Sequence, residues 1–174
     1  TAPGLTAARP KALSQVMMGV LNKLAMVFDG AFWPTERDFL GYISKTPGEF
    51  PVFLNGAKLG SDKALMAFVG GSAARELEQQ SFDTIMSCIG AIPAAMFASN
   101  AMPPRALYFS RWARDPFSLG SYSHVPVGGT SKAYAALAEP IGRVHFAGEH
   151  TSSDHPGTVH GAFLSGIRAA KELA

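Results

Sequence analysis

The sequence predicts a mixed α/β protein, and three observations lead to that prediction. Several short apolar runs are separated by Gly, Pro and Asn turn signals, which is typical of strands in a sheet. Other segments place apolar residues three and four positions apart, as on one face of a helix. The 174 residues, 47% of them hydrophobic, are enough for one compact domain or for two small ones that share a core.

The amino-terminal part is expected to begin with a helix and to continue into a sheet. Residues 11–22 carry apolar side chains with the spacing of one helix face: Leu13, Val16, Met17, Val20 and Leu21. The run LAMVFDGAFW that follows is continuously apolar, which favours a buried strand. The next three strand candidates are Phe39–Ser44, Pro51–Asn55 and Ala64–Val69. They are separated by turn signals at Pro47-Gly48, Asn55-Gly56 and Gly60-Ser61.

Two helices are predicted after this sheet. Ser72 is a suitable N-cap for the segment SAARELEQQ, and a second helix is expected from Ser81 to about Ile89. The chain then returns to a strand at LYFSRW, from Ala106, and to an irregular stretch that ends near Gly129.

The carboxy-terminal part is expected to hold two helices and one strand. The helices are predicted near Lys132–Ala138 and from about Thr158 to Leu173, and the strand is VHFAGE, residues 144–149. The last helix has one face of small and apolar residues, suited to close packing on a sheet or a cofactor: Val159, Ala162, Phe163, Gly166, Ala169 and Ala170.

Charge and composition exclude several classes of partner. Lys plus Arg number 15 and Asp plus Glu 13, so the net charge of +2 gives no electrostatic footprint for nucleic acid or for an anionic membrane surface. Gly, Pro or a charge interrupts every apolar run before the roughly 18 to 20 residues that span a bilayer, and we expect a soluble chain. A single cysteine, Cys88, excludes an internal disulfide and fits a reducing compartment, of which the cytoplasm is favoured.

The amino terminus has no signal-peptide pattern. The chain starts at Thr1 and runs into TAPGLTAARP, without a charged region followed by an apolar one. We therefore expect the chain to begin partway through a longer protein.

A strand, a glycine-bearing loop and a helix start follow one another near the carboxyl end. Gly148-Glu149 closes the predicted strand, and Gly157-Thr158-Val159 opens the predicted helix. Unpaired backbone N–H groups and the helix dipole converge at such a junction and favour an anion. Many α/β proteins contain this junction without using it, so the spacing alone leaves a structural and a binding role open.

Five histidines make a metal site the rival hypothesis for this region: His124, His145, His150, His155 and His160. The last four recur every fifth position, which puts neighbours on opposite faces of a strand and far apart around a helix. No cysteine or carboxylate pair completes a tetrahedral set, so the sequence argues against a metal.

Three strings resemble one family. VHFAGEHTSSDHPGTVHGAFLSGIRAA, WARDPFSLGSYSHVPVG and MGVLNKLAMVF are similar to the carboxy-terminal half of the flavin-dependent amine oxidases, which include monoamine oxidases, polyamine oxidases and lysine-specific histone demethylases. The strings occur in the family's order, and the resemblance extends from about Met17 to the end of the chain.

The resemblance implies the carboxy-terminal part of an FAD-binding Rossmann-like domain together with a substrate-binding region of sheet and helices. Residues 1–28 would end a flavin-domain segment, 29–105 would form the substrate-binding region, and 106–174 would complete the FAD-binding domain. The family's G-x-G-x-x-G loop has no counterpart here, because VGGSAARELE has a different glycine spacing. A missing amino-terminal FAD-binding segment of the same protein is therefore an expected partner.

Three residues match catalytic positions of the family. Lys23 matches the lysine that holds a water near flavin N5; without the resemblance, it is either a solvated lysine at a strand end or a functional ammonium in apolar surroundings. Tyr122 matches the first wall of the aromatic cage on the amine's path to the flavin. Thr158 occupies the position of the second wall, a tyrosine in monoamine oxidases, which favours a more open site.

The remaining matches concern the cofactor. Trp112 matches the tryptophan of a W-x-x-D-P-like motif, which packs beside the flavin ring; its alternative is an ordinary core aromatic. Gly148 and Glu149 match a G-E motif, whose carboxylate interacts with the ribityl or phosphate region. Gly157, Thr158 and Val159 match the helix start whose backbone N–H, at Val159, faces the flavin C2 carbonyl.

The implied activity is oxidation of an amine to an imine by hydride transfer to flavin N5, with dioxygen reduced to hydrogen peroxide and FAD as cofactor. An amine and dioxygen are the implied small-molecule partners, and the threonine at position 158 favours a polyamine or secondary amine over a small aryl amine. The alternative is a catalytically silent homologous segment that acts as a binding or interaction module.

Overall fold

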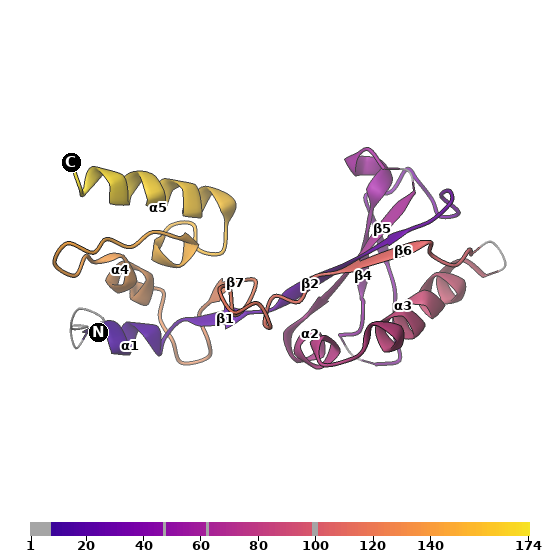
Figure 1. Cartoon of the computed structure of the whole chain (residues 1–174), viewed down its shortest axis with the longest axis horizontal. Helices are drawn as coiled ribbons and strands as arrows, with labels where there is room; N and C mark the ends of the chain where they lie inside the picture. Colours follow the sequence, from indigo (N-terminus) through magenta and orange to yellow (C-terminus); the bar gives the residue numbers. More distant parts are fainter. Residues whose placement is uncertain (1–7, 47, 62, 99–100) are drawn as a thin grey trace. The chain divides into compact units, whose positions relative to one another are not determined.

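The chain divides into two units, each of which has its own set of secondary-structure elements (Figure 1). The computed structural model describes residues 8–46, 48–61, 63–98 and 101–174. Unit 1 consists of residues 1–19 and 120–174, and unit 2 consists of residues 20–119. The mixed α/β class predicted from the sequence is confirmed.

The boundaries between the structural units lie at other positions than 28/29 and 105/106, and the division into flavin and substrate regions at those two positions stays a prediction. The units divide at 19/20 and at 119/120 because β2 (Leu21–Val27) and β6 (Ala106–Phe109) are strands of the sheet in unit 2. Lys23 and Trp112 therefore both belong to unit 2.

Unit 2 is built on a five-stranded sheet in the order β3-β4-β5-β2-β6, in which every neighbouring pair is antiparallel. The other strands are β3 (Phe39–Gly41), β4 (Val52–Asn55) and β5 (Ala64–Gly70). All three lie within or beside the predicted strand candidates. A short 3-10 helix, η1 (Gly56–Leu59), follows β4.

Two helices, α2 (Gly71–Glu78) and α3 (Phe82–Phe97), lie on the same side of this sheet (Figure 1). The even-numbered residues of β2 and the odd-numbered residues of β5 are buried in one cluster with isoleucines of α3. The odd-numbered residues of β2 are only half-buried. The run LAMVFDGAFW was predicted as a buried strand, and its first four residues do belong to β2; burial alternates along that strand, as in a sheet covered on one side.

The starts and ends of the two helices differ from the prediction. α2 begins at Gly71, and its N-cap is Gly70 without a side-chain cap, so the expected capping role of Ser72 is wrong. Ser81 does cap α3, because its hydroxyl accepts a hydrogen bond from Thr84 N at 3.2 Å. α3 continues beyond Ile89 to Phe97, since buried Ile85, Ile89 and Ile92 repeat at helical spacing on the sheet.

Unit 1 combines short helices with one two-stranded ribbon. Its elements are α1 (Ala8–Leu13), β1 (Met17–Gly19), β7 (Tyr122–His124), α4 (Lys132–Ala138), η3 (Glu149–Thr151) and α5 (Val159–Lys171). The predicted helix over 11–22 is wrong, because α1 ends at Leu13 and Met17–Gly19 pairs with β7 instead. β7 falls in the stretch that was expected to be irregular.

The predicted strand over 144–149 is also wrong. Only an isolated bridge joins Ile141 to Val144, and the following backbone groups bond to side chains of α5 in place of a neighbouring strand. Arg168 Nη2 donates to Phe146 O at 2.8 Å, and Gly148 N donates to Ser165 Oγ at 2.8 Å.

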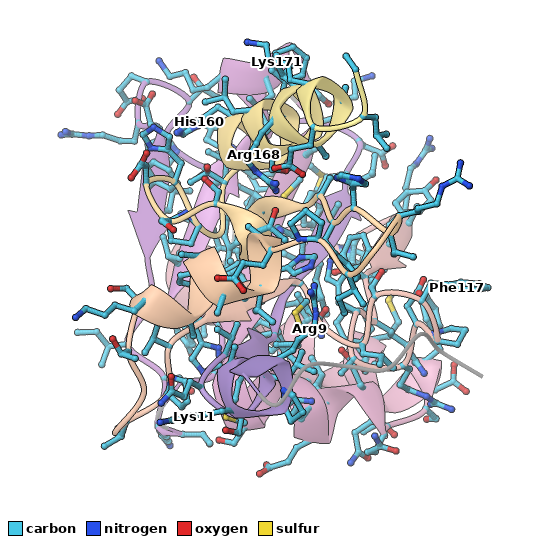
Figure 2. The ribbon with its side chains drawn as sticks, turned by 90° about the vertical axis from the view of Figure 1, so that its left-hand side faces the viewer. Arg9, Lys11, Phe117, His160, Arg168 and Lys171 are labelled. Carbon is cyan, nitrogen blue, oxygen red and sulfur yellow. The ribbon has the colours of Figure 1, made fainter. Side chains whose placement is uncertain are left out.

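Two arginines hold elements of unit 1 together: Arg9 is buried and Arg168 is half-buried (Figure 2). The Arg9 guanidinium stacks on the Phe146 ring, 3.4 Å from its centroid, and donates to the carbonyls of Leu137 and Glu139. Arg168 bonds Phe146 O and Thr151 Oγ1. These side chains join α1, α4, α5 and the 144–151 loop, where apolar packing is sparse. No helix within the described ranges is long and apolar enough to cross a membrane.

Candidate functional site

Lys23 lies on the face of the sheet that α2 and α3 leave uncovered. In β2 it alternates with buried Asn22 and Leu24, and it pairs across the sheet with Phe68 of β5. The other strand residues of this face, within the described part of the chain, are uncharged: Leu21, Ala25, Val27, Phe39, Gly41, Val52, Leu54, Ala64, Met66, Phe68, Gly70, Ala106 and Tyr108. The structure thus places one ammonium on an otherwise apolar or aromatic surface.

A shallow groove of about 460 Å³ runs beside Lys23. It is lined by Lys23, Ala25, Leu107, Tyr108, Phe109 and Ser110. Tyr108 pairs with Ala25 and is 66% exposed, so an aromatic ring is available next to the ammonium. Aromatic and apolar walls around a few polar groups are typical of small-molecule sites.

Trp112 follows β6 at the end of the same sheet. Its indole is 38% exposed, so it is not an ordinary core aromatic. Its backbone N–H donates to Asn22 Oδ1 at 3.3 Å, and Asn22 immediately precedes Lys23. Unit 2 therefore brings the segments of Lys23 and Trp112 together by direct hydrogen bonding.

Asp115 of the same motif stabilises the turn after Trp112. Its Oδ1 accepts backbone hydrogen bonds from Ser118 at 2.9 Å and from Phe117 at 2.8 Å. These hydrogen bonds to the ionised form, with that from Ser118 the larger effect, lower the pKa of Asp115 from its ordinary value. The W-x-x-D-P motif is thus held partly by its own carboxylate.

The other predicted site residues gather in unit 1. Tyr122 lies in β7 and is 39% exposed. A Cβ placed on Gly157 would lie 3.7 Å from its ring carbon Cδ2, so the ring borders the loop that leads into α5. Thr158 and Val159 are the next two residues of that loop and helix.

Glu149 joins β7 to this loop. Its Oε1 accepts from Ser123 N at 2.9 Å, and its Oε2 accepts from Ser123 Oγ at 2.7 Å and from Gly157 N at 2.6 Å. Three donors from the chain itself therefore hold the carboxylate, and they fix Tyr122 and Gly157 relative to each other. A carboxylate accepts about four hydrogen bonds, so one position on Oε1 remains for a ligand hydroxyl or water.

Gly148 occupies a backbone conformation that only glycine adopts readily. Its φ is 126° and its ψ is 160°, and a Cβ there would lie 2.6 Å from a carbon of the His150 ring. Its carbonyl accepts hydrogen bonds from both the backbone N–H and the hydroxyl of Thr151. Gly148 thus gives the sharp turn that orients Glu149.

Thr158 is the N-cap of α5. Its hydroxyl accepts from Gly161 N at 3.0 Å and donates to His155 O at 2.7 Å. Thr158 therefore has a structural role as a helix cap, and its role as a cage wall stays a prediction.

Val159 opens α5 with a side chain that is 89% exposed. The first N–H groups of a helix have no acceptor within the helix, and the dipole makes this end partially positive. The exposed surface of Val159, the ring of Tyr122 and this helix end together suit a flat aromatic group with carbonyl oxygens. These are groups of the kind that a flavin ring would need from unit 1.

The packing face of α5 differs from the expected one. Gly161, Ser165 and Ala169 are buried, whereas Val159 and Phe163 are exposed. Only Ala169 belongs to both the expected and the observed buried sets. Glycine is needed at position 161, where α5 crosses its own loop, because a Cβ there would meet His155 O at 2.0 Å.

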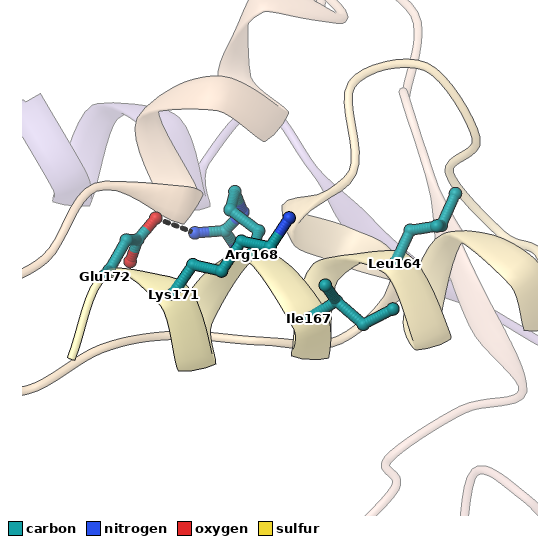
Figure 3. A pocket seen from close by; sticks show the side chains of 5 residues that line it. All are labelled: Leu164, Ile167, Arg168, Lys171 and Glu172. Carbon is teal, nitrogen blue, oxygen red and sulfur yellow. Dashed lines mark hydrogen bonds and ion pairs between the residues drawn. The ribbon is translucent and has the colours of Figure 1, made fainter. Parts of the chain in front are cut away.

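A second surface of α5 carries a shallow depression lined by Leu164, Ile167, Arg168, Lys171 and Glu172 (Figure 3). Glu172 accepts from Arg168 Nη1 at 2.6 Å and bonds His145 Nδ1 at 3.0 Å. The hydrogen bond with His145, followed by that from Arg168, lowers the pKa of Glu172 below its ordinary value of 4.5.

The histidines are not assembled into a metal site in the described part of the chain. No group of three or more His, Cys, Asp or Glu there is placed to hold an ion. His155 and His160 lie close, with ring centroids 4.6 Å apart.

Sequence reasoning missed Asn22, Glu78 and Ser123, which orient the predicted site residues. Asn22 was detectable, because it occupies a core-facing position in phase with Leu24 and Met26 and is a polar exception there. Glu78 and Ser123 carry no comparable signal, since their partners lie 56 and 26 residues away in sequence.

The chain was also compared with known families and proteins. The family model described as "Flavin containing amine oxidoreductase" matches residues 1–174. The chain is 37% identical, over 179 residues, to "Lysine-specific histone demethylase 1 homolog 3" of Oryza sativa subsp. indica; the match covers 98% of this chain and 22% of that protein. It is also 37% identical to "Polyamine oxidase 4" of Oryza sativa subsp. japonica, with 98% of this chain and 34% of the relative covered.

A solved structure of putrescine oxidase bound to putrescine has a similar fold, with a TM-score of 0.81 at 22% sequence identity. The match covers 98% of this chain and 38% of the putrescine oxidase chain. The chain therefore spans between about a fifth and two fifths of the length of the proteins that it resembles.

Proposed function

Because this chain belongs to the flavin-containing amine oxidoreductases, we propose that it supplies the substrate-facing sheet and part of the flavin-contacting surface of an amine oxidase. The expected cofactor, FAD, agrees with this family. Unit 2 would contribute Lys23 and Trp112, and unit 1 would contribute Tyr122, Glu149 and the start of α5.

When bound, the flavin would supply the hydride acceptor for the carbon next to the amine nitrogen; overall, the amine would lose two electrons and two protons to give an imine, and dioxygen would take them up to give hydrogen peroxide. The chain's own residues orient the amine and a water and stabilise the negative charge on the ring. The Lys23 ammonium holds a water by hydrogen bonding at the open sheet face. The N–H at Val159 places partial positive charge where the ring gains negative charge. Tyr122 forms one wall of the path that the amine follows.

The observation that carries this proposal is the position of Lys23. It is the one charged strand residue on the described open face of the sheet, beside Phe68 and near Tyr108. An ammonium there receives no support from a neighbouring strand carboxylate, and its desolvation would be costly if the face were covered by apolar groups alone. A bound water and the polar edge of a flavin ring would provide hydrogen-bond partners for the Lys23 ammonium.

We propose a polyamine or a secondary amine as substrate in preference to a small aryl amine. Thr158 is much smaller than a tyrosine, so the second wall of the amine path is open to a nitrogen that carries two carbon chains. The relatives include lysine-specific demethylases and a polyamine oxidase, whose names indicate such amines.

The experiment uses the complete protein that contains this chain. A visible absorbance scan of purified protein should show bound flavin. Anaerobic mixing with spermine, with an N-methylated lysine peptide and with benzylamine should bleach the flavin faster for the first two, and air should then yield hydrogen peroxide. Complete protein without flavin, or with flavin that no amine reduces, would favour the silent binding module.

A further inference from the structure

Unit 2 contains a buried polar cluster that the proposed mechanism does not use. We call it the Glu78 network: the side chains of Asn22, Glu78 and Ser110 with the backbone N–H groups of Trp112 and Ala113. Asn22 and Glu78 are both 0% exposed. They come from β2 and from the last residue of α2, while the other members follow β6. Three elements therefore meet in this cluster.

The Glu78 carboxylate holds two segments at one oxygen. Its Oε1 accepts from Asn22 Nδ2 at 2.7 Å and from Ala113 N at 3.1 Å. Asn22 is the neighbour of Lys23, and Ala113 is the neighbour of Trp112. Glu78 thus touches both segments that carry the predicted site residues of unit 2, without reaching either side chain.

The network continues through Asn22 and Ser110. Asn22 Oδ1 accepts from Trp112 N and from Ser110 Oγ, each at 3.3 Å, and Lys23 N donates to Ser110 Oγ at 2.9 Å. Ser110 N also donates to Lys23 O at 3.0 Å. The backbone of Lys23 and the backbone of Trp112 are therefore linked by short, mostly buried hydrogen bonds.

Two arginines hold the same loop against the end of α2. Arg111 Nη1 and Arg114 Nη1 donate to the Glu78 carbonyl at 3.3 and 3.1 Å, and Arg111 Nη2 donates to Gln80 O at 3.2 Å. Cations are favoured at a helix C-terminus, where carbonyls lack partners within the helix. Glu78 thus binds residues 111–114 with its backbone as well as with its side chain.

Burial of a carboxylate is unfavourable, because the group loses its hydration. Its Oε2 is buried and has no hydrogen-bond partner among the residues that the structure describes. Burying a polar group without a partner is destabilising, and an apolar residue of similar volume would avoid that cost. A role in packing alone therefore does not account for a glutamate at position 78.

We propose that Glu78 is a positioning residue, which fixes the Trp112 indole relative to the Lys23 ammonium at one end of the open sheet face. The proposal rests on the proposed function, because it assumes that these two side chains act on the same flavin. Its geometry lies within unit 2, so the positioning itself is testable in the chain without a cofactor.

The test uses the full chain labelled with 5-fluorotryptophan and observed by ¹⁹F NMR. The chain has two tryptophans, so it gives two resonances, and Trp112→Phe identifies them. Trp33, 4% exposed in the core, reports on the fold of unit 2. Glu78→Leu should shift or broaden the Trp112 resonance by more than its linewidth and leave that of Trp33 in place. Glu78→Gln keeps an accepting oxygen and should leave both unchanged.

Glu76→Leu is the matched control, because Glu76 is an exposed glutamate on the same helix. Ser110→Ala removes one hydroxyl from a half-buried position and replaces Glu78→Leu as the test variant if that variant fails to fold. It should shift the Trp112 resonance in the same direction as Glu78→Leu. An unmoved Trp112 resonance in the folded variants would overturn the proposal, and so would an equal effect on Trp33.

A second measurement separates this proposal from the proposed function. In the complete flavoprotein, Glu78→Leu should alter the visible spectrum of the bound flavin, and Glu78→Gln should restore it. A moved Trp112 resonance with an unchanged flavin spectrum would support the positioning role of Glu78 and contradict the placement of Trp112 beside the flavin.

Discussion

Lys23 is the residue whose replacement separates function from folding most cleanly. In the complete flavoprotein, Lys23→Met should leave the flavin bound, because the role proposed for the ammonium is to hold a water and not to contact the ring itself. Reduction or reoxidation of the flavin should slow at least tenfold, about 1.4 kcal/mol of barrier for each factor of ten. Stopped-flow absorbance would follow both half-reactions. Lys63→Met, at an exposed lysine just before β5, is the control, and unchanged rates in Lys23→Met would mean that this lysine has no catalytic role.

Thr158 combines a demonstrated cap with a predicted specificity role. Thr158→Tyr should narrow the amine path and lower turnover of secondary amines more than that of small primary amines. Thr158→Val should keep the width of the amine path but remove the cap of α5, which should lower the free energy of unfolding by about 1 kcal/mol. Specificity ratios and thermal stability of both variants in the complete enzyme separate the roles, with Thr158→Ser as the conservative control. If Thr158→Tyr loses stability at a fixed ratio, the substrate inference fails.

At the scale of elements, the stability that Glu172 contributes at the end of α5 should depend on pH. The hydrogen bonds from His145 and Arg168 lower the pKa of Glu172 in the folded chain, so the folded state favours the carboxylate. This contribution to stability is fully present above the unfolded pKa, near 4.5, and is lost as the pH falls through the lower folded value. Glu172→Gln should lower the melting temperature near neutral pH, and the difference should vanish well below pH 4.5.

The control for this measurement is Glu139→Gln, at an exposed glutamate of unit 1. It should change the melting temperature little at either pH. A Glu172→Gln difference that persists unchanged in strong acid would show that the side chain acts through packing and not through its charge.

Prediction of elements from the sequence succeeded where local pattern and burial agree. The strands of unit 2, α4 and α5 follow from apolar runs, turn signals and caps within one segment. Prediction failed where a partner distant in sequence determines the secondary structure. Met17–Gly19 is a strand because it pairs with β7. Residues 145–148 do not form a strand, because backbone groups of Phe146 and Gly148 bond to the side chains of Arg168 and Ser165. The candidate site residues match family motifs and stay predictions, whereas Asn22, Glu78 and Ser123 were found only from their contacts.

At the scale of the whole molecule, the chain by itself should bind FAD weakly. The cofactor contacts proposed for it are to the ring end, and no G-x-G-x-x-G loop is present in the sequence for the pyrophosphate. FAD should therefore bind this chain no more tightly than riboflavin does, as measured by quenching of flavin fluorescence. Stoichiometric and much tighter binding of FAD would contradict the expectation and would place a phosphate site within these residues.

The β1–β7 ribbon also has a consequence for the order in which the chain folds. Gly19 pairs with Tyr122, and Ser121 N donates to Gly19 O at 2.8 Å, so unit 2 is an insertion whose two ends are held together by unit 1. The ribosome synthesises the whole of unit 2 before residues 120–174, so the elements of unit 2 leave the exit tunnel before most of unit 1 does. Closing β1 onto β7 across an unfolded segment of that length carries a loop-closure entropy cost, and a folded insertion with fixed ends shortens the effective loop. Unit 2 should therefore fold first during synthesis, and a substitution that slows its folding should delay unit 1 as well.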